Sequence, residues 1–228
     1  MPTIKVNDIN IHYEIHGEGE PLVLIGGLGT DQSIFKLCLS RFSQKFKVLI
    51  FDNRGSGQTD KPDIPYSIDM LSNDTAALMD AVGIEFAHIL GISMGGRVAM
   101  SLTLRYPGKV KSLILVSTAA NVKSKLPYIH KALKWIRSKI SKDNQPYYAF
   151  KRQLYASRSY DCSSRLNEIK VPTLILHGRN DKLVKSTQAE EMKYGINEAN
   201  LVVFNGGHLF FLWENKKFVD AVFEFLMR

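Results

Sequence analysis

A serine between two glycines is the first feature of this sequence that could carry chemistry. Residues 91–95 read GISMG and lie between an apolar run typical of a buried strand and a helical pattern. In that context the glycines allow a sharp, strained turn, because flanking side chains would collide with the neighbouring strand or helix. Such a turn exposes the Ser93 hydroxyl beside a helix N-terminus, whose N–H groups favour a developing oxyanion. The alternative is an ordinary glycine-rich turn with an idle serine.

A serine hydroxyl is a poor nucleophile at neutral pH, so this interpretation requires a base, and histidine has the appropriate pKa. His208 lies in the segment NGGH, directly after the last apolar run, where glycines let a loop fold over the strand ends. The other histidines lie in expected strands, in a hairpin or in a basic insertion: His12, His16, His88, His130 and His177. We therefore predict His208 as the general base.

The histidine in turn needs a carboxylate that fixes its tautomer. Asp181 closes the segment HGRND, which follows another apolar run, and we predict it as this acid. The order of Ser, then Asp, then His agrees with a serine on a strand-to-helix turn and differs from the two familiar serine-protease orders. A solvated turn aspartate is the alternative, since Asn-Asp pairs are common in turns.

The last requirement is a pair of N–H donors for the oxyanion. One is predicted at Met94, which follows the serine, and the other at Leu28, in the segment GGLG after the first apolar run. Glycines permit a close backbone approach there. A tight turn without a binding role is the alternative. A dinucleotide-binding G-x-G-x-x-G motif is excluded, because residues 30–32 read TDQ.

Apolar runs that alternate with helical patterns predict a mostly parallel sheet with helices on both faces. Each run is too apolar for a strand with one face in water. The predicted strands are Pro21–Ile25, Lys47–Phe51, Ala87–Leu90, Lys111–Val116, Thr173–Leu176 and Leu201–Phe204. An antiparallel edge hairpin is expected before them, formed by Thr3–Val6 and Ile9–His16.

Apolar side chains at offsets of three and four predict a helix over Ser67–Val82, with Ser67 as its N-cap. Further helices are expected from Ser93 to Tyr106 and from about Glu214 to the carboxyl end. The interval 121–170 interrupts the alternation and has a helical pattern of its own, at Ile129, Leu133, Ile136 and Ile140. We predict a small helical cap there.

The size of the chain, 228 residues, fits one large α/β domain. We expect residues 1–120 and 171–228 to form its core and residues 121–170 to form the cap. The cap holds twelve Lys and Arg against three acidic residues, so its net charge of +9 exceeds the +8 of the whole chain. No Cys/His finger spacing and no aromatic RNA-binding motif accompanies this charge, and we predict no nucleic-acid partner.

The composition also bears on where the protein works. No run of about 18 apolar residues is present, and the first 17 residues mix charged with apolar side chains, unlike a secretory signal. We expect a cytoplasmic protein in which Cys38 and Cys162 are reduced.

Together these segments resemble the α/β-hydrolase superfamily over nearly the whole chain. Residues 51–57, FDNRGSG, are similar to the D-x-R-G-x-G turn of that superfamily, which supports the site. Residues 27–31, GLGTD, and 117–120, STAA, are similar to segments of the 3-oxoadipate enol-lactonases and related esterases. Where the superfamily often has His-Gly, this chain has Gly26 and Gly27, which keeps the backbone donor and loses a side chain.

The resemblance implies a serine hydrolase without metal or cofactor, which cleaves a small carboxylic ester or lactone through an acyl-enzyme. Serine at position 93 excludes the haloalkane dehalogenase branch, which would require aspartate there. Two alternatives stay open: a C–C bond hydrolase or acyl lyase with the same triad, and a ligand-sensing signalling protein with a vestigial triad.

Substrate choice is expected to depend on the cap. Its lysines could attract an acidic substrate or a membrane surface, although a solvated helix face is the preferred interpretation. Its aromatic side chains could line an apolar pocket or pack the cap onto the core: Trp135, Tyr147, Tyr148, Phe150 and Tyr155.

Overall fold

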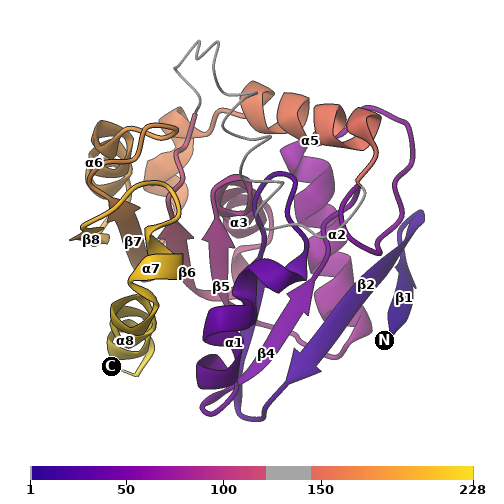
Figure 1. Ribbon diagram of the computed structural model, residues 1–228, viewed down its shortest axis with the longest axis horizontal. Coiled ribbons are helices and arrows are strands. Elements are labelled where there is room, and N and C mark those ends of the chain that lie inside the picture. The colour runs from indigo at the N-terminus through magenta and orange to yellow at the C-terminus, as the bar shows by residue number, and fades with distance from the viewer. Residues whose placement is uncertain (1, 122–144, 228) are drawn as a thin grey trace.

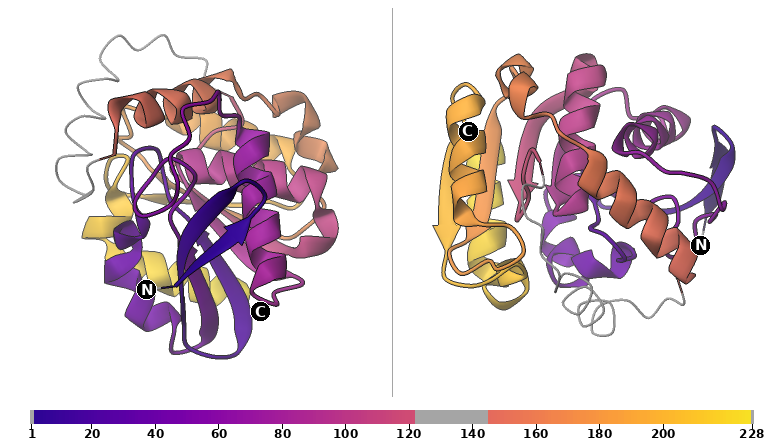
Figure 2. Two further views of the ribbon diagram at one scale, coloured as in Figure 1. Left: turned by 90° about the vertical axis from the view of Figure 1, so that its right-hand side faces the viewer. Right: turned by 90° about the horizontal axis from the view of Figure 1, so that it is seen from above.

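A single eight-stranded sheet organises the chain (Figure 1). The computed structural model describes residues 2–121 and 145–227. The sheet order is β1-β2-β4-β3-β5-β6-β7-β8, parallel from β4 to β8, with β2 antiparallel to both β1 and β4. The strands are β1 (Thr3–Val6), β2 (Ile9–His16), β3 (Glu20–Ile25), β4 (Phe46–Phe51), β5 (Ala87–Ile92), β6 (Val110–Val116), β7 (Thr173–Gly178) and β8 (Asn200–Phe204). Every predicted strand is confirmed, and Figure 2 shows the indigo hairpin at the sheet edge.

Helices cover both faces of this sheet. They are η1 (Gln32–Phe35), α1 (Lys36–Phe42), α2 (Ile68–Ala81), α3 (Met94–Arg105), η2 (Pro107–Lys109), α5 (Tyr147–Ser159), η3 (Ser163–Glu168), α6 (Ser186–Gly195), α7 (Phe210–Trp213) and α8 (Asn215–Leu226). The three helices predicted outside the cap are confirmed as α2, α3 and α8. The Ser67 hydroxyl caps α2 by accepting a hydrogen bond from Met70 N at 3.0 Å.

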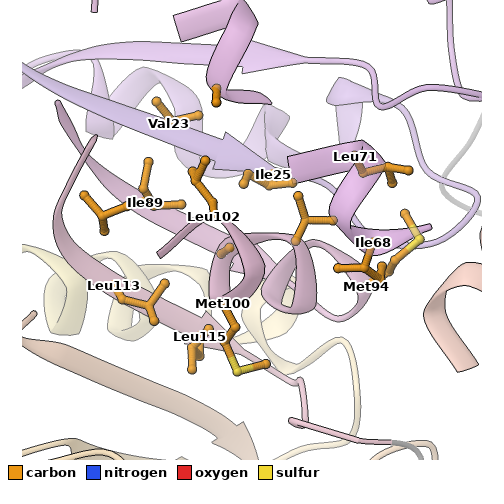
Figure 3. Packing of buried hydrophobic residues seen from close by; sticks show 14 of the residues in the cluster. Val23, Ile25, Ile68, Leu71, Ile89, Met94, Met100, Leu102, Leu113 and Leu115 are labelled. Atoms are coloured by element: carbon orange, nitrogen blue, oxygen red, sulfur yellow. The ribbon is translucent and has the colours of Figure 1, made fainter. Parts of the chain in front are cut away.

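Successive strand residues point to opposite faces, and this alternation creates two cores. In β3, Val23 and Ile25 pack with α2 and α3 in the core drawn in Figure 3, whereas Leu22 and Leu24 pack with α1 and α8. The central strands β3, β5 and β6 are therefore buried on both faces, which explains their continuous apolar runs.

The last strand departs from the expectation that both faces of every strand are covered. Val202 and Val203 of β8 are 38% and 43% exposed. β8 lies at the edge of the sheet, with β7 as its neighbour on one side. Edge strands tolerate apolar side chains that are only partly covered, so the apolar run correctly predicted a strand but not its burial.

The interval predicted as a cap contains α5, which lies in orange along the top of the domain, beyond the ends towards which β5 and β6 point (Figure 1). The helical pattern at residues 129–140 lies outside the described residues. The division of the chain into a core and a cap at 121–170 stays a prediction. None of the helices in residues 2–121 and 145–227 combines the length and apolarity needed to cross a membrane.

Both cysteines are free and buried, in agreement with the predicted reduced state. Burial raises the pKa of the Cys38 thiol to about 12 and also raises that of Cys162. Neither thiol is therefore activated as a nucleophile.

Candidate active site

Ser93 lies on a strained turn between β5 and α3. Its φ is 56° and its ψ is −113°, a backbone conformation that residues other than glycine rarely adopt. The turn is fixed at both ends of the residue: Ser93 N donates to Val116 O at 2.9 Å, and Thr118 Oγ1 donates to Ser93 O at 2.6 Å. A Cβ at position 95 would meet Ile25 O, so only glycine lets α3 start this close to β3.

The loops after β7 and β8 are tied to each other by their backbones. Arg179 N donates to Phe204 O at 2.9 Å, and Asn180 N donates to Gly206 O at 2.8 Å. Because β7 and β8 are adjacent and parallel, these loops emerge at the same edge of the sheet. Asp181 and His208, which are 27 positions apart, are thereby brought together.

The three residues predicted as a triad form one chain of hydrogen bonds. His208 Nε2 lies 3.0 Å from Ser93 Oγ, and His208 Nδ1 lies 2.7 Å from Asp181 Oδ2. A carboxylate can only accept, so Nδ1 carries the proton and Nε2 is free to accept the serine proton. This is the tautomer that a general base requires.

The Asp181 carboxylate is held from several sides and shielded from water. Its side chain is 0% exposed, whereas that of His208 is 10% exposed. Asp181 Oδ1 accepts from Leu183 N at 2.8 Å and from Val184 N at 3.0 Å. These donors leave Oδ2 directed at the imidazole, and the low local dielectric strengthens that contact.

A second histidine lies close to the same carboxylate. His177 Nε2 is 3.8 Å from Asp181 Oδ2, and it donates to Val184 O at 3.0 Å. Burial lowers the pKa of His177, although the nearby Asp181 charge acts in the opposite direction. His177 is therefore neutral at ordinary pH. Because its Nε2 donates to Val184 O, the side chain that hydrogen-bonds Asp181 Oδ2 is His208.

The glycine segment after β3 borders Ser93. A Cβ built on Gly27 would lie 3.5 Å from Ser93 Cβ, so the loop backbone passes close to the serine. A cavity of about 30 Å³ lies beside Ser93 and His208, and its other walls include Leu28, Ile92 and Phe211. Met94 is the first residue of α3. Both predicted oxyanion donors thus belong to segments next to Ser93, and their role stays a prediction.

The segment after β4 supports that glycine loop. Asn53 Nδ2 donates to Gly26 O at 3.0 Å, and the Gln32 and Gln58 N–H groups donate to Asp52 at 2.7 and 2.8 Å. Burial raises the pKa of Asp52, and these two donors act in the opposite direction. The segment therefore joins the loop after β4 to the loop after β3.

The aromatic residues of α5 do not line the cavity at Ser93. Tyr147 and Tyr155 are 61% and 69% exposed, so they neither line that cavity nor pack the helix onto the core. Tyr148 and Tyr155 border a separate outer cavity of about 600 Å³. Phe150 is buried and faces Gly29, with a ring atom 3.1 Å from the position of a Cβ there. Of the aromatic side chains of α5, only Phe150 packs against the glycine loop beside Ser93, and Trp135 lies outside the described residues.

Four further residues hydrogen-bond to these loops or to Ser93, and their contacts were not predicted from the sequence: Thr30, Thr118, Gln153 and His177. Thr118 and Gln153 contact residues 25 and 124 positions away, which no local pattern reveals. Thr30 and His177 bond to nearby residues, Gly27 and Val184, and these bonds depend on the conformation of their loops. Only the spacing of His177 and Asp181 was visible beforehand. In the described ranges, residues 2–121 and 145–227, no group of three or more His, Cys, Asp and Glu is arranged to hold a metal ion.

Comparison with known proteins identifies the family. The sequence pattern of the family described as alpha/beta hydrolase fold matches residues 20–163 and 141–215. The chain belongs to this family. As an α/β-hydrolase it is a hydrolytic enzyme, in agreement with the resemblance found in its sequence.

Relatives of this α/β-hydrolase cover its whole length. It is 27% identical to the putative carbamate hydrolase RutD of Azorhizobium caulinodans, over 92% of both chains. The enol-lactonase of Burkholderia xenovorans is 27% identical, with a TM-score of 0.88 over 100% of both chains. A meta-cleavage product hydrolase of Pseudomonas fluorescens is 25% identical, with a TM-score of 0.85 over 99% of this chain and 97% of that one.

Proposed function

We propose that this α/β-hydrolase is a serine hydrolase that cleaves a small carboxylic ester or lactone through an acyl-enzyme. The observation that supports it best is the chain of hydrogen bonds from Ser93 Oγ through His208 to Asp181, with lengths of 3.0 and 2.7 Å. Nucleophile, base and orienting acid are all within the distances that nucleophilic catalysis requires.

In the first half-reaction, His208 Nε2 removes the proton from Ser93 Oγ as the oxygen attacks the ester carbonyl. Asp181 stabilises the imidazolium that forms, because its carboxylate accepts the hydrogen bond from Nδ1. The N–H groups of Leu28 and Met94 bind the oxyanion, and the N-terminal dipole of α3 favours the same charge. Collapse of the tetrahedral intermediate transfers the His208 proton to the leaving alcohol.

In the second half-reaction, water replaces the alcohol. His208 removes a proton from this water, which attacks the acyl carbonyl and forms a second tetrahedral intermediate. Collapse of that intermediate returns the proton to Ser93 Oγ and releases the carboxylic acid. The substrate therefore needs a carbonyl group next to a leaving group, and every proton is handled by the residues described above.

The side chains around the nucleophile suit a substrate with an apolar acyl or alkyl group. Ile34, Ile92, Leu209 and Phe211 lie around the cavity beside Ser93. The similarity to an enol-lactonase supports a lactone, and the similarity to a protein named as a putative carbamate hydrolase makes carbamates the next class to assay.

The test compares the wild-type protein with Ser93→Ala on p-nitrophenyl esters of increasing acyl length, on enol-lactones and on carbamates. We expect turnover of at least one ester or lactone by the wild type and its loss in the variant. Ser93→Ala with wild-type activity contradicts the proposal. So does a folded wild type that is stabilised by such compounds without turning them over, which would indicate a ligand-sensing protein.

A C–C bond hydrolase is the second candidate, because the chain is similar over its length to a meta-cleavage product hydrolase. In that reaction the leaving group is a carbon atom, and the substrate is a diketone or its enol tautomer. Product analysis on diketones separates the two candidates: cleavage of a diketone without cleavage of any ester favours this second one.

A further inference from the structure

The peptide group that carries the Leu28 N–H has a fixed direction. No cis peptide bond occurs in the described chain, so the peptide bond between Gly27 and Leu28 is trans. Within that planar group, the Gly27 carbonyl and the Leu28 N–H point in opposite directions. The Gly27 oxygen accepts from Thr30 Oγ1 at 3.0 Å and from Thr30 N at 3.4 Å. Thr30 thereby sets the direction in which the Leu28 N–H points.

The next peptide group of the loop is held from α5. Gln153 is 0% exposed, and its Oε1 accepts from Gly29 N at 3.2 Å and from Gln145 Nε2 at 3.1 Å. Its Nε2 donates to Arg54 O at 2.7 Å and to Ser56 Oγ at 2.9 Å. All four hydrogen-bonding capacities of this amide are therefore used.

The loop needs this support because glycines make it intrinsically flexible. Residues 26–29 read GGLG, and Gly29 has a φ of +69°. Unsupported glycine segments visit many backbone conformations, whereas an oxyanion donor stabilises charge only when it is already aimed. Thr30 and Gln153 fix the peptide groups on either side of the Leu28 side chain.

We propose that Thr30 and Gln153 are positioning residues, which hold the Leu28 N–H in the direction that binds the oxyanion. Neither side chain takes part in proton transfer. Gln153 makes the activity depend on α5, because its buried side-chain amide lies on that helix and accepts the hydrogen bond from Gly29 N of the loop. The inference rests on the proposed serine hydrolase function and adds to it the residues that organise its oxyanion donor.

The test uses Thr30→Val, which keeps the shape of the side chain and removes the hydroxyl. Removal of one oxyanion donor costs about 10²–10³ in kcat, so a misaligned donor should cost about 10–100-fold, with little change in KM. Inhibition by phenylboronic acid, which forms a tetrahedral adduct with an active serine, should weaken in the same proportion. Thr30→Ser retains the hydroxyl and should restore kcat.

Two controls separate positioning from stability. Thr75 is fully buried on α2, and its Oγ1 donates to Leu71 O at 2.9 Å. Thr75→Val removes this hydroxyl-to-carbonyl hydrogen bond away from the site and should leave kcat unchanged. Gln153→Met should lower kcat as Thr30→Val does, whereas Gln188→Met, which loses a bond to Asn121 O, should not.

The outcomes are distinct. A wild type with Ser93-dependent turnover and a folded Thr30→Val variant with wild-type kcat and wild-type boronate affinity overturn the role of Thr30. Should Thr30→Val not fold, Gln153→Met with unchanged kcat overturns the inference instead. A wild type without any Ser93-dependent turnover overturns the proposed function, and the inference with it.

Discussion

At the scale of single residues, the site depends on which atom of His208 carries the proton. Asp181 is held by the Leu183 and Val184 N–H groups, and its free oxygen fixes a proton on His208 Nδ1. Nε2 is therefore an acceptor facing Ser93 Oγ before any substrate binds. In the proposed mechanism the Asp181 carboxylate acts by fixing this tautomer and does not itself accept the proton.

Asp181→Asn tests this role. An amide at this position can direct its NH₂ group at the imidazole, which then carries its proton on Nε2 and cannot accept the serine proton. We expect a folded variant whose kcat is lower by about ten-thousandfold. The measurement is kcat on the best ester, with circular dichroism as the control for folding. Activity within tenfold of wild type would assign the acid role elsewhere.

At the scale of elements, the loop after β4 joins the hairpin to α2. The Arg54 guanidinium donates to Asp74 on α2 at 2.7 Å and to Asp8 in the hairpin turn at 2.5 Å. The Arg54 and Asp74 side chains are 1% and 3% exposed. Burial alone would lower the pKa of Arg54, but its hydrogen bonds to Asp74 and Asp8 raise it above its ordinary value. The arginine stays charged inside the protein.

Arg54→Met should be strongly destabilising, because it leaves the Asp74 carboxylate buried without a counter-charge. We expect the free energy of unfolding to fall by about 3–5 kcal/mol, measured by urea denaturation. Arg41→Met is the matched control. The Arg41 side chain is 34% exposed and that of its partner Asp220 is 50% exposed, so loss of this ion pair should lower the free energy of unfolding by about 1 kcal/mol or less. Equal losses in the two variants would contradict the account.

The positions of the strands and of α2, α3 and α8 could be predicted from the sequence because each depends on a local pattern. The helices α1, α6 and α7 were not predicted. Six strands follow apolar runs, β1 and β2 follow a hairpin pattern, and α2 follows an N-cap and a period of three to four. The pairing of Asp181 with His208 follows from strand order. The contacts of Gln153 and Asn53 could not be predicted, because they join loops that meet only after the sheet is assembled. The exposure of β8 likewise depends on its place at the sheet edge.

At the scale of the whole molecule, stability should depend on pH through buried groups. His177 is 0% exposed, and burial lowers its pKa below the ordinary value of about 6.5. Its folded form is neutral where its unfolded form binds a proton. Its contribution to stability is therefore complete above about pH 6.5 and is lost as the pH falls from there towards its folded pKa.

His177→Gln tests this dependence, because glutamine can still donate to Val184 O but does not titrate. The difference in free energy of unfolding between wild type and variant should narrow as the pH falls below about 6.5, since only the wild type takes up this proton on unfolding. Urea denaturation at pH 8, 6.5 and 5.5 gives that difference. A difference that is constant over this range would show that His177 does not titrate differently on unfolding.

The acyl-enzyme at Ser93 is the central claim, and trapping it is the most direct measurement. Wild type and Ser93→Ala are mixed with a p-nitrophenyl ester, quenched in acid within milliseconds and mapped by peptide mass spectrometry. We expect an added acyl mass on the peptide with Ser93 in the wild type, with a burst of p-nitrophenol, and neither in the variant. Turnover without an acyl group on Ser93, or an acyl group on another residue of an active enzyme, would contradict it.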